Sequence, residues 1–270
     1  MKIALILIAA LSFFGVITYN LKTSEDKTES GKTTETSAPQ SQTMVEKRSP
    51  VLVELFTSEG CSSCPPADKN LIEFNEKQPF AEANVITLSM HVDYWNRLGW
   101  TDPFSSAQFS QRQGFYSNTF NLGEVYTPQM VVDGMRQFVG GNSDEARKAI
   151  NQAVKSPKAS VELSIAAGNK LKVKISAIPA HSFSNVFVAI AEDNILTSVR
   201  NGENGGRTLP HDSVVRELRT IGSLSEKDNN FETEALFRIQ STWKRGNLKA
   251  VVFVQVEKDS QIIGVNQIKL

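Results

Sequence analysis

The segment that most constrains the fold of this chain is "VELFTSEGCSSCPPAD", residues 53–68. It continues an apolar run that starts at Val51 and ends in turn residues, a pattern typical of a strand buried on both faces. Pro65 and Pro66 directly follow the second cysteine. Because proline is tolerated only in the first turn of a helix, we expect a helix that begins close to Ser62. The predicted order is strand, cysteines, helix.

Cys61 and Cys64 are the two cysteines of the chain. At the start of a helix, free backbone amides and the helix dipole favour a reactive thiolate. Cys64, one turn later, is then placed to attack a mixed disulfide formed at Cys61. We expect Cys61 to attack and Cys64 to resolve, with this redox-active disulfide as the catalytic centre and no other cofactor. A structural disulfide and a metal clamp remain alternatives.

A metal clamp built on C-x-x-C usually brings a second pair of Cys or His residues at ligand spacing. No such pair is present here, because His91, His181 and His211 are far apart in the sequence. We therefore predict no metal ligands. Copper(I) prefers soft thiolates, so a copper-binding or metallochaperone-like protein that uses the dithiol with His91 remains an alternative.

The first residues predict export. In residues 1–21, Lys2 precedes an apolar run of about 17 residues, and no small-x-small cleavage site follows it. This is an export signal or, as we favour, a retained single-span membrane anchor. Residues 22–49 are rich in Ser and Thr and are expected to form a disordered linker. The chain is thus expected in the periplasm or another extracytoplasmic compartment, where paired cysteines form disulfides.

Charge patterning argues against nucleic acid as a partner. The chain has 29 Lys and Arg and 29 Asp and Glu residues, and no basic run is longer than Lys47 and Arg48. The expected partners are protein or small-molecule thiols and disulfides, together with the membrane if the N-terminal segment is uncleaved.

Residues 50–157 are expected to form a first domain. A second buried strand is predicted in "NVITLSMHV", a helix after Asp102 and Pro103, and a hairpin around Asp133 and Gly134. Asn142 then caps a last helix. The predicted order is β-α-β-α-β-β-α. In residues 158–270 the helical period disappears and short alternating strands predict a β-sandwich-like domain.

The first domain resembles thioredoxin in three features: the order of its elements, C-x-x-C at the first helix, and Thr127-Pro128 before the third strand. The resemblance implies that Pro128 is a cis-proline facing the dithiol and that Thr127 binds an extended substrate peptide. It also implies that Glu54, in the strand before the cysteines, deprotonates Cys64, although this position is offset by one residue. A solvent-facing Glu54 at a strand edge is the alternative.

Four stretches are similar to the secreted thioredoxin-like proteins of the domain-of-unknown-function family 1223. They are "VELFTSEGCSSCPPAD", "HVDYWNRLGWTDPF", "YTPQMVVDG" and "NGENGGRTLPHDSVV". The resemblance covers the chain from about Val51 to its end and implies no settled substrate. The expected fold is an α/β thioredoxin-like domain, a mixed sheet flanked by helices, followed by the β-sandwich-like domain.

Two further segments are candidates for the site. Tyr94 and Trp95, with Trp100, are expected either to form a substrate wall beside the dithiol or simply to pack under a long insertion. The Gly-rich segment 200–213 is expected to dock the second domain onto the first, near Cys61. It lacks the ending of a phosphate-binding loop.

Together these features favour an exported thiol-disulfide oxidoreductase. The alternatives are the copper(I)-binding protein and a non-catalytic thioredoxin-like interaction protein with a structural disulfide.

Overall fold

The computed structural model of this chain describes residues 48–270. The predicted signal or anchor (1–21) and nearly all of the predicted linker (22–49) lie outside the described residues. Within residues 48–270, no helix is both long and apolar enough to cross a membrane.

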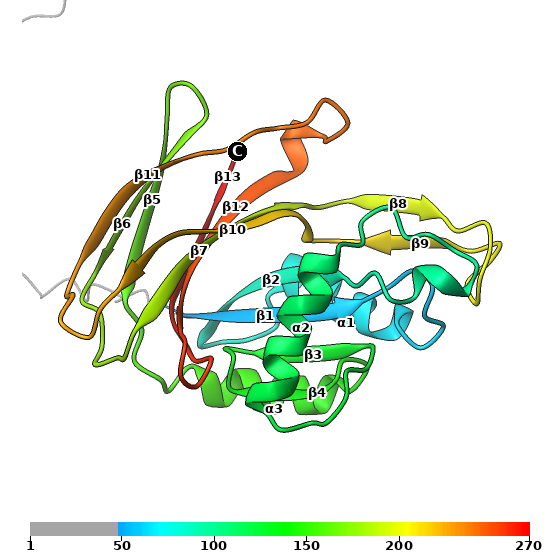
Figure 1. Cartoon of the computed structure of the whole chain (residues 1–270), viewed down its shortest axis with the longest axis horizontal. Coiled ribbons are helices and arrows are strands. Elements are labelled where there is room, and N and C mark those ends of the chain that lie inside the picture. Colours follow the sequence, from blue (N-terminus) through cyan, green and yellow to red (C-terminus); the bar gives the residue numbers. More distant parts are fainter. Residues whose placement is uncertain (1–47) are drawn as a thin grey trace, which may run out of the picture. The chain divides into compact units, whose positions relative to one another are not determined.

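Most of the described chain is β-structure, built around one sheet of eight strands (Figure 1). Across the sheet the strands follow in the order β13 (Ile262–Lys269), β12 (Leu248–Val256), β7 (Ser184–Glu192), β10 (Val214–Leu224), β2 (Ala83–His91), β1 (Ser49–Thr57), β3 (Gln129–Val132) and β4 (Arg136–Val139). β1 and β2 are parallel, and β10 joins β2 in parallel through Val214 and Ser89. The other neighbouring strands run antiparallel.

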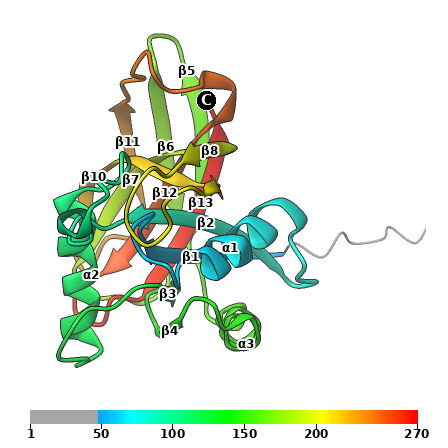
Figure 2. The ribbon, with the colours of Figure 1, turned by 90° about the vertical axis from the view of Figure 1, so that its right-hand side faces the viewer.

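Three α-helices cover the end of this sheet that carries β1 (Figure 2). α1 (Pro65–Lys77) and α3 (Ser143–Ala153) lie on one face and α2 (Ala107–Thr119) lies on the other. Side chains alternate along a strand, so β1 supplies both cores. Val53 and Leu55 pack towards α1 and α3, whereas Leu52 and Phe56 pack towards α2. This explains the nearly continuous apolar run in the sequence.

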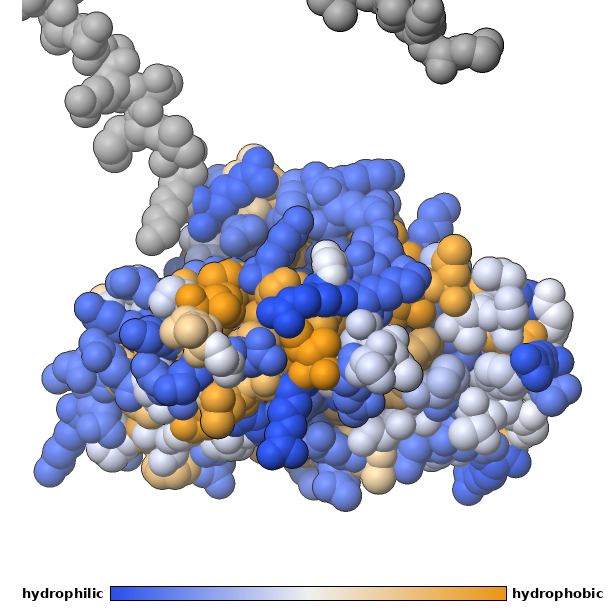
Figure 3. Space-filling model, turned by 90° about the horizontal axis from the view of Figure 1, so that it is seen from above, coloured by the Kyte–Doolittle hydropathy of each residue, from blue (hydrophilic) through white to orange (hydrophobic). Residues whose placement is uncertain are grey.

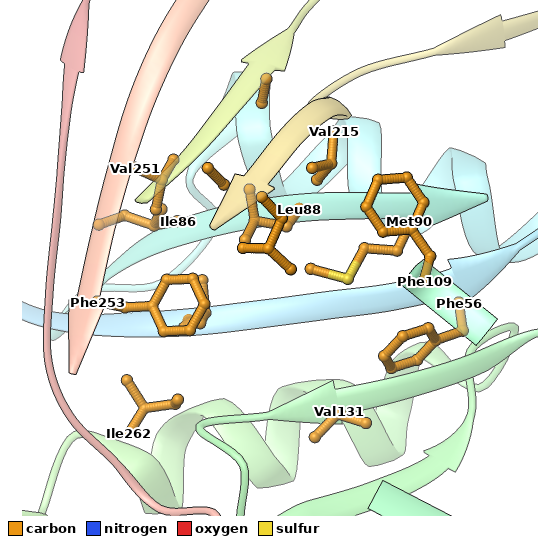
Figure 4. Close-up of a cluster of buried hydrophobic side chains, with 14 of the residues drawn as sticks. Phe56, Ile86, Leu88, Met90, Phe109, Val131, Val215, Val251, Phe253 and Ile262 are labelled. Carbon is orange, nitrogen blue, oxygen red and sulfur yellow. The ribbon is translucent and has the colours of Figure 1, made fainter. Parts of the chain in front are cut away.

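The core on the α2 face extends across the sheet from β1 to β12. Figure 4 shows side chains from strands distant in sequence pointing into one cluster, among them Phe56, Leu88, Met90 and Phe253. Phe109 of α2 closes the cluster near the end of β2. Burial of these large side chains, about 1.5–3 kcal/mol each, ties the N-terminal and C-terminal strands into one unit.

A second, three-stranded sheet covers the other end of the large sheet. It contains β11 (Phe231–Leu236), β6 (Lys170–Ser176) and β5 (Ser160–Ala166). Apolar side chains of this sheet, such as Leu171 and Val173, pack against Val188 of β7 and Val252 of β12. Seen from above, hydrophilic residues cover most of the surface, with hydrophobic residues gathered in smaller groups between them (Figure 3).

The predicted fold class is wrong. We expected a helix-flanked thioredoxin-like domain followed by a separate β-sandwich-like domain, but strands from both sides of residue 157 share one eight-stranded sheet. The physical reason lies at the edge of β2, where the backbone amide of Ser89 donates to the carbonyl of Ser213 at 2.8 Å and β10 adds alongside. β7, β12 and β13 then extend the same sheet. Strand periodicity does not specify which strand edges will pair.

Several local predictions are confirmed. β1, α1 and β2 form the expected crossover with β1 and β2 parallel. The hairpin of β3 and β4 turns at Asp133 and Gly134, which both have positive φ angles. Asn142 caps α3, its side-chain oxygen accepting from the amide of Glu145 at 3.1 Å. The last, two-stranded sheet joins β8 (Ile195–Ser198) to β9 (Thr208–His211).

Candidate functional site

A disulfide joins Cys61 and Cys64, whose Cα atoms are 5.4 Å apart, in the turn between β1 and α1. Both cysteine side chains have 0% exposure, whereas Ser62 and Ser63 between them are exposed. Cys64 precedes the first helical residue, Pro65. The helix thus begins three residues later than expected, because two prolines fit its first two positions.

This geometry corrects the expected environment of Cys61. Two backbone amides that follow Cys61 donate to other acceptors than its sulfur. The amide of Ser62 donates to the carboxylate of Glu203 at 2.8 Å, and the amide of Cys64 donates to the carbonyl of Cys61 at 3.2 Å. Cys64, not Cys61, occupies the open end of the helix.

The loop between β8 and β9 holds the disulfide turn. The side-chain amide of Asn204 is buried and donates to the carbonyls of Glu59 and Cys61, at 2.9 Å each. Arg207 in turn donates to the side-chain oxygen of Asn204 at 2.7 Å. The hydrogen bonds from Ser62 lower the pKa of Glu203 and favour its charged form. The prediction that segment 200–213 docks near Cys61 is confirmed.

Thr127-Pro128 contains a cis peptide bond, as the resemblance to thioredoxin implied. The indole nitrogen of Trp95 donates to the Thr127 hydroxyl at 2.8 Å. Trp95 also packs beside Gly60, where an added Cβ atom would lie 3.3 Å from the Trp95 Cβ. Trp95 therefore links the disulfide turn to the predicted substrate-binding dipeptide.

Pro128 and Tyr94 lie in the same region of the fold. The carbonyl of Pro128 accepts from the amide of Gly140, and the carbonyl of Gly140 accepts from Asn70 of α1. The Tyr94 hydroxyl donates to Gln113 of α2 at 3.1 Å, and burial raises its pKa. Thr127, Pro128, Tyr94 and Trp95 remain predicted substrate-binding residues.

Glu54 lies elsewhere. It shares the α2 face of β1 with Leu52 and Phe56, opposite the face that packs on α1. Its carboxylate accepts from Arg112 Nε at 2.6 Å and from the Tyr116 hydroxyl. Burial tends to lower the pKa of Arg112, but attraction to Glu54 raises it above its ordinary value. The structure does not bring Glu54 together with Cys64, the residue it was predicted to deprotonate.

Directly beneath the disulfide turn lies a group of buried acids and bases that we call the acid–base cluster. It comprises Glu59, Asp68, His91, Asp102 and His211. Each is at most 6% exposed. β1 and β2 end in register, Thr57 opposite His91, so the cluster lies at the carboxyl ends of two parallel strands, where ligands usually bind in open α/β sheets.

One half of the cluster is a buried ion pair. His91 Nδ1 donates to Asp102 Oδ2 at 2.7 Å. Asp102 also accepts from the amides of Glu59, at 2.8 Å, and Phe104, at 2.9 Å. Burial tends to lower the pKa of His91, but attraction to Asp102 and their hydrogen bond raise it overall. Burial tends to raise the pKa of Asp102, but His91 and the two amides lower it.

The other half is less completely paired. His211 Nε2 lies 3.3 Å from Glu59 Oε1, although the two atoms are not aligned for a hydrogen bond. Glu59 Oε2 accepts from the indole nitrogen of Trp100 at 2.8 Å. The His91 and His211 rings are 4.9 Å apart at their centroids, and both contact Phe104. Burial raises the pKa of Asp68, and attraction to the two histidines opposes this.

Six buried polar atoms in this region have no hydrogen-bond partner. They are Thr57 Oγ1, Glu59 Oε1, Asp68 Oδ1, His91 Nε2 and both ring nitrogens of His211. An unpaired buried polar group typically costs about 1–3 kcal/mol. Such a concentration of unpaired polar atoms and perturbed pKa values in one place is characteristic of functional sites.

Sequence reasoning did not find this cluster. It considered His91 only as an alternative copper ligand and His211 only as part of the docking loop, and it left out Glu59 and Asp68. The available signal was local: Glu59 is two residues before Cys61, and Asp68 is one helical turn after Cys64. Within residues 48–270, no three His, Cys, Asp or Glu side chains are arranged to hold a metal ion.

Comparison with known proteins places this architecture in a family. The family described as "Protein of unknown function (DUF1223)" matches residues 52–255. No curated protein matches the chain. A crystal structure of a protein from Agrobacterium tumefaciens is 26% identical, covers 82% of this chain and 95% of its own, and superposes with a TM-score of 0.66. A domain of the outer membrane lipoprotein Omp28 from Porphyromonas gingivalis is 17% identical over 42% of this chain and 88% of its own, with a TM-score of 0.25.

Proposed function

Because the chain belongs to the DUF1223 family, whose description names no activity, we propose from the site alone that it is an exported thiol-disulfide oxidoreductase. Its Cys61–Cys64 pair would exchange with protein or small-molecule thiols and disulfides in the periplasm or another extracytoplasmic compartment. The compartment follows from the predicted export segment 1–21, which also makes the membrane a partner if it is retained.

The observation that carries this proposal is the acid–base cluster beside the disulfide. Breaking a disulfide with thiols releases thiolates that must be protonated, and forming one removes those protons again. Buried acids and bases on the segments that carry the cysteines suit this chemistry: Glu59 lies in the disulfide turn, and the amide of Asp68 donates to the carbonyl of Cys64 at 3.1 Å. A disulfide that served only as a staple would gain nothing from the unpaired polar atoms of Asp68 and His211, which reduce the stability of the fold.

Full burial of both cysteines means that exchange requires local opening. The part of the fold best suited to open is the loop between β8 and β9, because Glu203 and Asn204 hold the disulfide turn through three hydrogen bonds. The two buried hydrogen bonds of Asn204 are worth about 1 kcal/mol net each, so opening of the loop costs only a few kcal/mol. Gly202 and Gly206, with φ angles of 75° and 81°, give this loop turns that other residues adopt at a cost.

After opening, a thiolate of the partner attacks Cys61 Sγ. The Cys61–Cys64 bond breaks, its electron pair stays on Cys64 Sγ, and a mixed disulfide forms at Cys61. A second thiolate of the partner then attacks the partner sulfur that is bonded to Cys61. This releases Cys61 as a thiolate. The partner is oxidised to a disulfide and the protein is left as a dithiol. The reverse sequence reduces a partner disulfide and forms the Cys61–Cys64 bond again.

One observation favours the second candidate function, an interaction protein with a structural disulfide. Complete burial of Cys61 and Cys64 is typical of inert structural cysteines. For the copper(I) alternative there is no comparable observation, since within residues 48–270 no three His, Cys, Asp or Glu side chains are arranged to hold a metal ion.

The experiment that tests the proposal traps Cys61. The Cys64→Ser variant is incubated with oxidised glutathione, and the mass of the folded protein is followed with time. We expect a glutathione adduct on Cys61 that forms at least about tenfold faster than on Cys64 in the matched Cys61→Ser variant, because opening of the loop that binds the Cys61 carbonyl uncovers Cys61. Equal, slow labelling of the two variants would favour the structural role. Retention of the folded state is checked by far-UV circular dichroism.

A further inference from the structure

The five side chains of the acid–base cluster are brought together only by the fold. They come from five separate segments: Glu59 from the disulfide turn, Asp68 from α1, His91 from the end of β2, Asp102 from the loop before α2, and His211 from the end of β9. Convergence of five titratable groups from distant segments is not explained by local sequence preference. All five are also shielded from solvent.

Asp68 is the member that continues the helix of the cysteines. Its backbone amide donates to the carbonyl of Cys64 at 3.1 Å, so the two residues lie one helical turn apart and on the same face of α1. Asp68 Oδ1 is buried and makes no hydrogen bond of normal geometry, although the nearby Thr57 hydroxyl acts to lower the pKa of Asp68. An unpaired carboxyl oxygen one turn from the resolving cysteine is well placed for proton exchange with it.

Three of the other four groups act directly on Asp68. His91 and His211 attract it, and Asp102 repels it. Glu59 lies beside His211, and the hydroxyl of Thr57 at the end of β1 also faces the carboxyl group of Asp68. Arg216 lies over the ring of Phe104 at 5.0 Å, and Phe104 contacts both histidines. Burial outweighs the attraction of the histidines and keeps Asp68 protonated to a higher pH than a surface aspartic acid.

We propose that the acid–base cluster is a proton store for the disulfide, in which Asp68 exchanges a proton with Cys64 and the two histidines renew it. This proposal rests on the proposed oxidoreductase function and assigns the proton step to named residues. It also replaces Glu54, which lies on the opposite face of β1 in an ion pair with Arg112.

A partner thiolate attacks Cys61 Sγ, the disulfide bond breaks, and its electron pair stays on Cys64 Sγ. The protonated carboxyl group of Asp68 gives its proton to this sulfur and becomes a carboxylate. His91, held in its protonated form by Asp102, or His211 then returns a proton to Asp68, and solvent replaces it when the loop between β8 and β9 opens. In the direction of disulfide formation, Asp68 accepts the proton of Cys64.

The test measures how fast the oxidised protein is reduced by dithiothreitol between pH 4 and pH 9. Each rate is divided by the concentration of dithiothreitol thiolate, so that the ionisation of the reductant is removed. For the wild-type protein we expect this corrected rate to fall as the pH rises through the pKa of Asp68. For Asp68→Asn we expect a corrected rate about 100-fold lower than that of the wild type at acidic pH. This rate should no longer change as the pH passes through the pKa of Asp68.

Two further variants complete the experiment. Asp68→Glu keeps the carboxyl group and should retain a pH-dependent rate, which also keeps the proposal testable if Asp68→Asn does not fold. Asp144→Asn makes the same change in the first turn of α3, on the exposed surface, and should match the wild type.

The outcomes separate the two proposals. If Asp68→Asn keeps the wild-type profile, the proton store is overturned while the oxidoreductase proposal stands. If it lowers the rate equally at every pH and leaves the profile unchanged, Asp68 has only a structural role, and the proton store is likewise overturned. If the folded wild-type protein is not reduced at any pH, the proposed function itself fails.

Discussion

Glu54 and Asp68 are both buried carboxyl groups near the start of the described chain, but their surroundings give them different roles. Glu54 has strong partners, Arg112 and Tyr116, which hold it in place on the α2 face of β1. Asp68 has an unpaired oxygen and two histidines nearby. A fully paired carboxylate contributes to stability, whereas an unpaired one is free to exchange protons.

For Glu54 we predict a loss of stability without a loss of the proton step. Glu54→Gln leaves Arg112 as an uncompensated buried charge, which typically costs about 3–5 kcal/mol. Urea unfolding at pH 7 measures this cost. In the dithiothreitol experiment the corrected rate of the folded variant should keep the wild-type dependence on pH. A flattened profile would instead restore the role that the resemblance to thioredoxin implied.

The ion pair of His91 and Asp102 gives a prediction about pH. The raised pKa of His91 stabilises the fold fully below its ordinary value of 6.5, and this contribution is lost as the pH rises through the folded-state value. The lowered pKa of Asp102 contributes above its ordinary value of 3.8 and is lost as the pH falls through the folded-state value. The pair is therefore most stabilising between about pH 4 and 6.5.

Asp102→Asn should lower the free energy of unfolding by about 3–5 kcal/mol near pH 5, because it leaves a buried cation unpaired. The cost should shrink at alkaline pH, where His91 of the variant and of the wild type are both neutral. Urea unfolding at pH 5, 7 and 9 checks this, with Asp144→Asn as the control. A cost that stays constant from pH 5 to pH 9 would show that His91 carries no charge in the folded protein.

At the scale of elements, we expect the loop between β8 and β9 to control access to the disulfide. It begins after Ser198, ends before Thr208, and crosses to the turn between β1 and α1 (Figure 1). Asn204 is its main attachment, with two hydrogen bonds to carbonyls of the disulfide turn. We attribute the burial of Cys61 to this contact, so weakening the contact should expose the disulfide.

Asn204→Ala removes both hydrogen bonds, worth about 1 kcal/mol each. Because 1.4 kcal/mol is a tenfold change in an equilibrium constant, the open state should become at least about tenfold more populated. The measurement is the rate of disulfide reduction by dithiothreitol at pH 7, which should rise by the same factor. Asn201→Ala changes an exposed residue of the same loop and is the matched control. An unchanged rate for Asn204→Ala would mean that another segment limits access.

Elements were predictable from the sequence where a local signal specifies them. Alternating or continuous apolar runs identified β1, β2 and the hairpin of β3 and β4, and Asn142 marked the start of α3. The double proline indicated that a helix starts nearby, but the predicted start was three residues too early. Proline is compatible with more than one position in the first turn, so a proline pair does not show which residue begins the helix.

At the scale of the whole molecule, prediction failed where distant strands meet. Val214 beside Ser89 joins the two halves of the chain into one sheet, and no periodicity in either strand encodes that contact. The acid–base cluster was missed for the same reason, since His91 and His211 are far apart in sequence and converge only after β9 and β2 are placed. The pairing of Cys61 with Cys64 and the cis peptide bond before Pro128 could be predicted, because each belongs to a short sequence motif.

The central claim is that the Cys61–Cys64 disulfide exchanges with thiols while the protein is folded. The most direct measurement is its reduction potential, obtained by equilibrating the folded protein with redox buffers of known potential and counting free thiols after acid quenching. The account predicts a value above about −300 mV, in the range of exchange-active dithiols. A value below about −300 mV, as structural disulfides show, would contradict it.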